Sequence, residues 1–119
     1  MAEGKMGAVE SRFADIIWAN EPISSTELAK RALEEFGWKK STTYTVLKRL
    51  CDKGMFKNEN GSVTSVVSKT DYYSAQSEKF VEETFDGSLP AFITAFTARK
   101  QLSQEEINEL KQMLDNYKG

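Results

Sequence analysis

The chain has no histidine and only one cysteine, Cys51, among its 119 residues. It therefore cannot assemble a zinc site from the usual nitrogen and sulfur ligands, and it cannot form an intramolecular disulfide. We expect neither a metal nor a cofactor. Cys51 lies at the edge of an apolar helix face, where a small buried apolar group is a simpler interpretation than a redox switch.

Long apolar segments are also missing. No apolar run is long enough to cross a bilayer, and the first residues lack the apolar central region of a secretory signal. We therefore expect a cytoplasmic protein with no membrane partner.

The chain has no glycine-rich phosphate loop and no nucleophile elbow, and acidic pairs such as Glu34-Glu35 and Glu105-Glu106 are typical of solvated helices. An enzyme is the weakest hypothesis.

The charge is unevenly distributed, although the net charge is only −2. Residues 38–57 carry six basic side chains and one acidic side chain, a local charge of +5. Residues 1–37 carry four basic and seven acidic side chains, and residues 78–119 carry five and eight. Attraction to phosphate is screened beyond about 10 Å, so the local charge matters more than the total. This pattern favours a nucleic-acid contact over residues 38–57.

The centre of that basic segment, STTYTVLKRLCDKG over residues 41–54, predicts an amphipathic helix. At about 100° per residue, one side is apolar: Thr43, Val46, Leu47 and Leu50, with Tyr44 and Cys51 at its edge. The other side holds Ser41, Thr42, Thr45, Lys48, Arg49 and Asp52, and Lys39 and Lys40 lie just upstream. Short hydroxyls followed by cations suit a helix that enters a DNA major groove. An ordinary amphipathic helix with a solvated charged face is the alternative.

Two further helices are predicted upstream. Residues 8–20 place Val9, Phe13, Ile16 and Ile17 at helical spacing with Trp18 alongside, and Pro22 then breaks the helix. Ser24 and Glu27 have the spacing of a capping box for a second helix that ends at Gly37. Its expected buried side is Leu28, Ala29, Ala32, Leu33 and Phe36, and Trp38 is expected to fill the core between helices.

A hairpin is predicted after the basic helix. Residues 55–59 and 62–67 have the pattern of two strands joined at Asn60-Gly61, a dipeptide that suits a type I′ turn. Three helices and a hairpin make a winged helix-turn-helix, so we expect a mainly α fold with a small β-hairpin wing (α+β). Lys57 is the only cation of the wing. A wing that contacts DNA and a wing that only packs both remain open.

The last third of the chain is predicted to be helical. Ser68 can cap a helix to about residue 86, Gly87 breaks it, and Ser103 with Glu106 forms another capping box. The apolar stripes of these helices have no further sheet to cover them, so we expect a homodimer. The alternative is that these helices fold back on the first three. We assign residues 1–69 to a DNA-binding domain and residues 70–119 to a dimerisation domain, with candidate contacts at Phe80, Phe85, Leu89, Phe92, Ile93, Phe96, Ile107, Leu110 and Leu114.

Three segments together resemble one family. ESRFADIIWANEPISSTELAKRAL, WKKSTTYTVLKRLCDKGMFK and FDGSLPAFITAFTARKQLSQEEINELKQML are similar, in order and spacing, to the BlaI/MecI-type penicillinase repressors of bacteria, which include copper-responsive members. The resemblance implies a dimeric repressor of β-lactam resistance or a related stress response, bound to a palindromic operator of double-stranded DNA. It places operator reading on Ser41, Thr42, Tyr44 and Thr45, with Lys48 and Arg49 near phosphates. Lys39, Lys40 and Lys57 complete the candidate DNA contacts.

The resemblance also implies a sensor-linked protease as a partner, acting at an Asn-Phe pair of the dimerisation helices. The corresponding pair here is Ala95-Phe96, which departs from that pattern. The chain ends in LDNYKG and lacks the cysteine-rich tail of the copper-responsive members, so we do not expect copper sensing. A winged-helix module that binds another protein and never touches DNA is the alternative function, suggested by the sparse wing and the acidic remainder.

Overall fold

The structure is a computed structural model that describes residues 6–119. It divides into two compact units, one ending at Gln76 and the other spanning Ser77–Gly119. We describe each unit by itself. The division falls after the expected boundary at residue 69, because the beginning of the fourth helix packs on the first unit.

The first unit contains the three predicted helices, α1 (Ala8–Asn20), α2 (Ser25–Phe36) and α3 (Lys40–Asp52). Their apolar sides meet in one core, where the largest fully buried side chains include Phe13, Ile17, Leu28 and Leu50. Trp38 packs against this core between helices, as predicted, with its ring 5.4 Å from that of Phe13 and 4.7 Å from that of Phe36. This packing fixes α3 against α2 and leaves its other side in solvent.

Two apolar side chains assigned to this core are exposed instead. Val9 is 46% exposed and Leu33 is 58% exposed, so both predictions are wrong. Each lies at the border of the stripe of its helix: Phe13, Ala14 and Ile17 are the buried residues of α1. Helical spacing defines the direction of a stripe, but the neighbouring elements decide how far it is covered.

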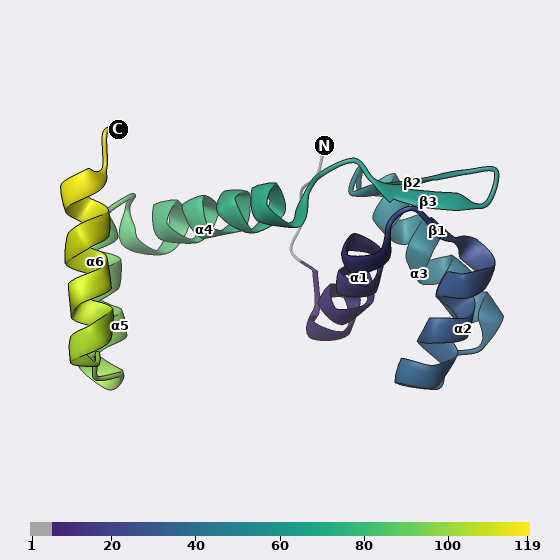
Figure 1. The fold of residues 1–119 in the computed structure, drawn as a ribbon, viewed down its shortest axis with the longest axis horizontal. Coiled ribbons are helices and arrows are strands. Elements are labelled where there is room, and N and C mark those ends of the chain that lie inside the picture. Colours follow the sequence, from purple (N-terminus) through teal and green to yellow (C-terminus); the bar gives the residue numbers. More distant parts are fainter. Residues whose placement is uncertain (1–5) are drawn as a thin grey trace. The chain divides into compact units, whose positions relative to one another are not determined.

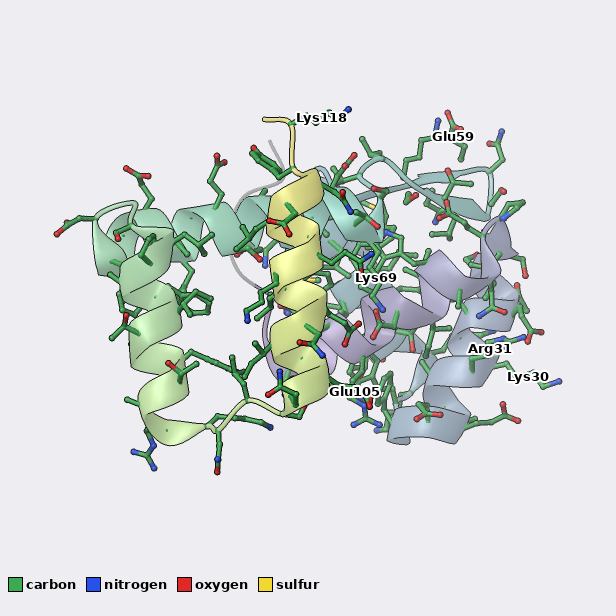
Figure 2. All side chains as sticks on the ribbon, turned by 60° about the vertical axis from the view of Figure 1, so that its left-hand side comes forward. Lys30, Arg31, Glu59, Lys69, Glu105 and Lys118 are labelled. Atoms are coloured by element: carbon green, nitrogen blue, oxygen red, sulfur yellow. The ribbon has the colours of Figure 1, made fainter. Side chains whose placement is uncertain are left out.

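The ends of α2 follow the predicted signals in part. Ser24 Oγ accepts a hydrogen bond from the Glu27 backbone N–H at 3.0 Å, and Gly37 ends the helix at φ 71°. The reciprocal half of the expected capping box is wrong, because the Glu27 carboxylate pairs with Arg31 one turn further on, at 3.0 Å. Figure 2 shows Lys30 and Arg31 extending outward from α2.

The wing is part of a three-stranded antiparallel sheet (Figure 1). Strands β2 (Phe56–Glu59) and β3 (Ser62–Ser65) form the predicted hairpin, and Asn60 and Gly61 have the positive φ values, 53° and 84°, that a type I′ turn requires. The sequence did not predict β1 (Ile23–Ser24), which pairs with β3. This short strand joins the wing to the connection between α1 and α2.

The second unit continues from α4 (Lys69–Phe85) into α5 (Leu89–Arg99) and α6 (Gln104–Asn116). The predicted caps are confirmed: Ser68 Oγ accepts from the Asp71 N–H at 3.0 Å, and Ser103 and Glu106 form a reciprocal capping box. Gly87, at φ 78°, separates α4 from α5. In the described chain, no helix combines the length and apolarity that a membrane span would need.

The first turns of α4 belong to the first unit. Tyr72 is only 3% exposed, and its hydroxyl accepts a hydrogen bond from the Met6 backbone N–H at 3.0 Å. Its neighbour Tyr73 is 38% exposed, because adjacent residues of a helix lie about 100° apart around its axis.

Candidate nucleic-acid interface

The solvent side of α3 carries the predicted short polar side chains. Ser41, Thr42 and Thr45 are exposed, whereas Thr43 is fully buried. Tyr44 is 38% exposed, so the border position predicted for it is confirmed. α3 therefore presents hydroxyls and one phenol to solvent along its first turns.

The Thr45 hydroxyl has a defined hydrogen-bonding role. It donates to the Ser41 carbonyl oxygen at 2.9 Å, one turn earlier in α3. Its proton is used inside the helix, and its lone pairs remain open to a donor from outside. At this position the helix surface accepts hydrogen bonds.

The beginning of α3 is the most open cationic site of the basic segment. Lys39 and Lys40 are exposed, and neither forms an ion pair with any residue that the structure describes. Lys39 is the N-cap and provides no side-chain hydrogen bond to the first N–H groups of the helix. An anion is favoured at this end of the helix by the open backbone N–H groups, by the positive end of the helix dipole and by the two lysines.

Two further cations of the segment form pairs on the open surface. Lys48 lies 3.2 Å from Asp52, and Lys57 lies 3.4 Å from Glu59 of the wing. All four side chains are more than half exposed, and Glu59 is visible on the hairpin in Figure 2. Exposed pairs of this kind contribute about 0–1 kcal/mol, so a phosphate can replace either carboxylate at little cost.

The remaining cations, Arg49 and Lys53, turn towards α1. Glu10 Oε2 accepts a hydrogen bond from Arg49 Nη1 at 3.0 Å, and Glu10 Oε1 lies 3.7 Å from Lys53 Nζ. Glu10 Oε1 also accepts from the Gly7 N–H at 3.2 Å. Burial alone would raise the pKa of Glu10, but the hydrogen bonds from Arg49 and Gly7 and the charge of Lys53 hold it below its ordinary value.

Hydrogen bonds from neighbouring segments hold the wing in place. Glu21 binds the end of β3, where its carboxylate accepts from the Ser65 N–H at 2.8 Å and from the Ser65 hydroxyl at 2.9 Å. The Ser25 N–H donates to the Gly61 carbonyl oxygen at 2.8 Å, which connects the hairpin turn to the start of α2. The wing is therefore held at both ends.

The second unit has a different surface. α5 and α6, both described in full, contain no buried residue. An apolar groove of about 350 Å³ lies between them, lined mainly by Phe92, Ile93, Phe96, Leu102, Leu110 and Met113.

The predicted dimerisation residues divide into two groups on this unit. The rings of Phe80, Phe85 and Phe92 contact one another edge to face at 5.6–6.0 Å, which joins α4 to α5 within the chain. Phe85, Phe92 and Ile107 are half-buried. The other members are more than a third exposed: Phe80, Leu89, Ile93, Phe96, Leu110 and Leu114.

Ala95 and Phe96, the pair expected from the resemblance to be the proteolytic site, both lie inside α5, and Phe96 is 47% exposed.

Cys51 is partly buried on α3, where burial first and Asp52 second raise the pKa of its thiol. No cluster of three or more histidine, cysteine, aspartate or glutamate side chains suited to a metal ion occurs among residues 6–119.

Comparison with known protein families gives a match that covers both units of the chain. The family model described as "Penicillinase repressor" matches residues 6–116. The chain belongs to the penicillinase repressor family. This is a family of transcriptional repressors and not of enzymes, in agreement with the sequence-based hypothesis.

Several curated members of the penicillinase repressor family match along most of their length. The penicillinase repressor of Bacillus licheniformis is 33% identical over 108 residues, which cover 87% of this chain and 84% of that protein. The methicillin resistance regulatory protein MecI of Staphylococcus aureus is 24% identical over 115 residues, covering 93% of this chain and 94% of that protein. A MecI of Mammaliicoccus sciuri matches with the same identity and coverage.

Proposed function

We propose that this member of the penicillinase repressor family is a dimeric repressor that binds a palindromic DNA operator through α3. One observation carries the proposal. The exposed hydroxyl side of α3 begins at two lysines, Lys39 and Lys40, that have no carboxylate partner among the described residues. Base-reading groups and phosphate-binding groups are therefore adjacent on one helix.

Direct base reading would come from the first turns of α3. Ser41 and Thr42 can donate or accept, so each can serve several bases. The Thr45 hydroxyl already donates to Ser41, which favours an amino group of adenine or cytosine as its partner. The Tyr44 ring is exposed enough to contact a thymine methyl group.

Phosphate binding would come from the ends of the same surface. Lys39, Lys40 and the open N–H groups of α3 would hold one phosphate region. Lys48 would exchange Asp52 for a second phosphate, because its present pair is fully on the surface. Lys57 would exchange Glu59 for a phosphate in the same way, from the wing.

The dimer would form through the second unit. α5 and α6 expose Ile93, Phe96 and Leu110 around an apolar groove, and a second copy of this chain is the occupant that a two-fold repressor requires. A symmetric dimer places two copies of α3 on two half-sites, about 34–36 Å apart or a multiple of that spacing. The operator would then be palindromic.

The names of the relatives suggest what is regulated. They refer to penicillinase and to methicillin resistance, so we propose control of β-lactam resistance or a related stress response. A sensor-linked protease is a further proposed partner. The bond between Ala95 and Phe96 lies within α5, so this helix would have to open locally before a protease could cut it.

A salt titration tests DNA binding by α3. The full chain is titrated with a labelled duplex at several salt concentrations, and the slope of log K against log salt is measured. Lys40→Ala should reduce the steepness of this slope by about 0.9 for each phosphate that a subunit no longer neutralises. Lys118→Ala is the matched control: it removes a cation that follows the end of α6 (Figure 2), so the slope should not change.

Absence of duplex binding at low salt would contradict the proposal. Capture of a protein partner with little salt dependence would then favour the alternative of a winged-helix interaction module.

A further inference from the structure

The Glu10 cluster, formed by Glu10, Gly7, Arg49 and Lys53, joins the start of α1 to the end of α3. Both carboxylate oxygens of Glu10 are engaged: Oε2 by Arg49 at 3.0 Å, and Oε1 by the Gly7 N–H at 3.2 Å with Lys53 at 3.7 Å. The Glu10 side chain is only 17% exposed. Two cations of the basic segment are therefore held by one sheltered carboxylate.

The other carboxylate near the end of α3 has a different environment. Asp52 is 66% exposed, and its ion pair among the described residues is with Lys48, which is 77% exposed. Water screens that pair almost completely, so Lys48 can leave Asp52 for a phosphate. Arg49 would have to leave a sheltered carboxylate whose second oxygen is fixed by a backbone N–H and whose charge Lys53 shares. Removing Arg49 or Lys53 would leave Glu10 less well compensated.

We propose that Glu10 is a positioning residue for DNA binding, which holds Arg49 and Lys53 against α1 and withholds them from phosphate. This inference rests on the proposed function, because it concerns which cations of α3 reach the duplex. It assigns the phosphate contacts of the helix to Lys39, Lys40 and Lys48, and it gives Arg49 a bracing role instead of the phosphate contact expected from the sequence.

The arrangement has a consequence for specificity. Contacts to phosphate strengthen binding to every duplex, whereas contacts to base edges strengthen binding to the operator. With Arg49 and Lys53 held by Glu10, a larger share of the binding free energy comes from the base-reading residues Ser41, Thr42 and Thr45. Release of the two cations would raise affinity for any sequence and lower the ratio of specific to non-specific binding.

A double-mutant cycle on the full chain tests this directly. The salt slope is measured on a mixed-sequence duplex of fixed length for the wild type, Glu10→Gln, Arg49→Gln and the double variant. Glutamine keeps the size of Glu10 and removes its charge. In Glu10→Gln we expect several-fold tighter binding to this duplex and a slope steeper by about 0.9 for each additional phosphate that a subunit neutralises.

Arg49→Gln separates bracing from phosphate binding. In the wild-type background it should leave the slope unchanged, and in the Glu10→Gln background it should return the slope towards the wild-type value. Lys40→Ala, measured in the same series, should lower the slope in both backgrounds, because its contact does not depend on Glu10.

The outcomes distinguish this inference from the proposed function. If Arg49→Gln lowers the wild-type slope as much as Lys40→Ala does, Arg49 binds phosphate and the role given to Glu10 is wrong, while the proposed function stands. If no variant and no wild type shows salt-dependent binding, the proposed function fails and this inference fails with it. If Glu10→Gln does not fold, the comparison of Arg49→Gln with Lys40→Ala in the wild-type background still decides whether Arg49 binds phosphate.

Discussion

The indole Nε1 of Trp18 donates a hydrogen bond to the Val67 carbonyl oxygen at 3.0 Å. This contact joins α1 to the segment that enters α4, and the Trp18 ring also lies 5.3 Å from that of Phe56 and 6.1 Å from that of Tyr72. One side chain thus connects the first helix, the wing and the start of α4. The beginning of α4 is fixed to the first unit by this relationship.

Trp18→Phe should lower the free energy of unfolding by about 1–3 kcal/mol, because the Val67 carbonyl loses its donor and the aromatic contacts shrink. Urea unfolding followed by circular dichroism measures the change. Trp38→Phe is a useful comparison, since Trp38 packs between Phe13 and Phe36 but its indole donates no hydrogen bond to a described residue. Equal losses in both variants would show that the hydrogen bond to Val67 contributes nothing measurable.

The stabilisation provided by Glu10 should depend on pH. The pKa of Glu10 is lowered in the folded chain, although burial acts in the opposite direction, because Arg49, Gly7 and Lys53 favour its charged form. A lowered pKa stabilises the fold at pH values above the pKa of the unfolded chain, and this contribution is lost as the pH falls through the folded value.

The measurement compares the free energy of unfolding of the wild type and Glu10→Gln at neutral and acidic pH. The difference should be largest near pH 7 and should shrink below about pH 4, where an ordinary glutamate takes up its proton. A difference that stays constant between these conditions would mean that the charge of Glu10 contributes no stability.

Cys51 should react slowly with alkylating reagents in the folded protein. Burial and the neighbouring Asp52 raise the pKa of its thiol, with Lys48 acting in the opposite direction, so little thiolate is present at pH 8. We expect iodoacetamide to modify the native chain more slowly than the chain unfolded in urea. Equal rates would show that neither burial nor charge protects Cys51.

Leu110→Asp should weaken the proposed dimer. Leu110 is 37% exposed and lines the apolar groove between α5 and α6, where a carboxylate would lose its water on association. Sedimentation velocity over a range of concentrations should show a shift towards monomer. Gln112→Asp adds the same charge at an exposed polar position of α6 and should leave the dimer intact. A wild-type chain that sediments as a monomer at every concentration would contradict the proposed dimer.

Local signals predicted most of the fold. Pro22, Gly37 and Gly87 mark helix ends, Ser24, Ser68 and Ser103 cap helices, and Asn60-Gly61 fixes the hairpin, because each acts through its own backbone or a neighbour a few residues away. These features need no knowledge of the tertiary structure.

Errors arose where contacts between distant parts of the chain determine the local structure. β1 consists of Ile23 and Ser24 only, and it exists because β3 pairs with it. Val9 and Leu33 are exposed because no neighbouring element covers them. Neither outcome is encoded in a short window. The error at Glu27 is of another kind, because its partner Arg31 lies only four residues further along the same helix and competes locally with the helix end.

In the candidate site, too, the features set by local sequence were predicted and those set by distant contacts were not. Helical spacing separated the exposed Ser41 and Thr45 from the buried Thr43 and Leu47, since the whole segment is one regular helix. It could not show that Glu10 holds Arg49 and Lys53, because those residues are about forty positions apart in the chain. The charge pattern located the basic segment, and only the structure divided its cations into paired and open ones.

Reading of a symmetric operator by two copies of α3 is tested most directly by selection of bound sequences from a random duplex pool. The full chain is used for the selection, and the bound duplexes are sequenced. We predict a palindromic consensus with half-sites spaced by about one helical turn or a multiple of it. Weak enrichment without symmetry would contradict this reading and would show that the basic segment provides only non-specific attraction to DNA.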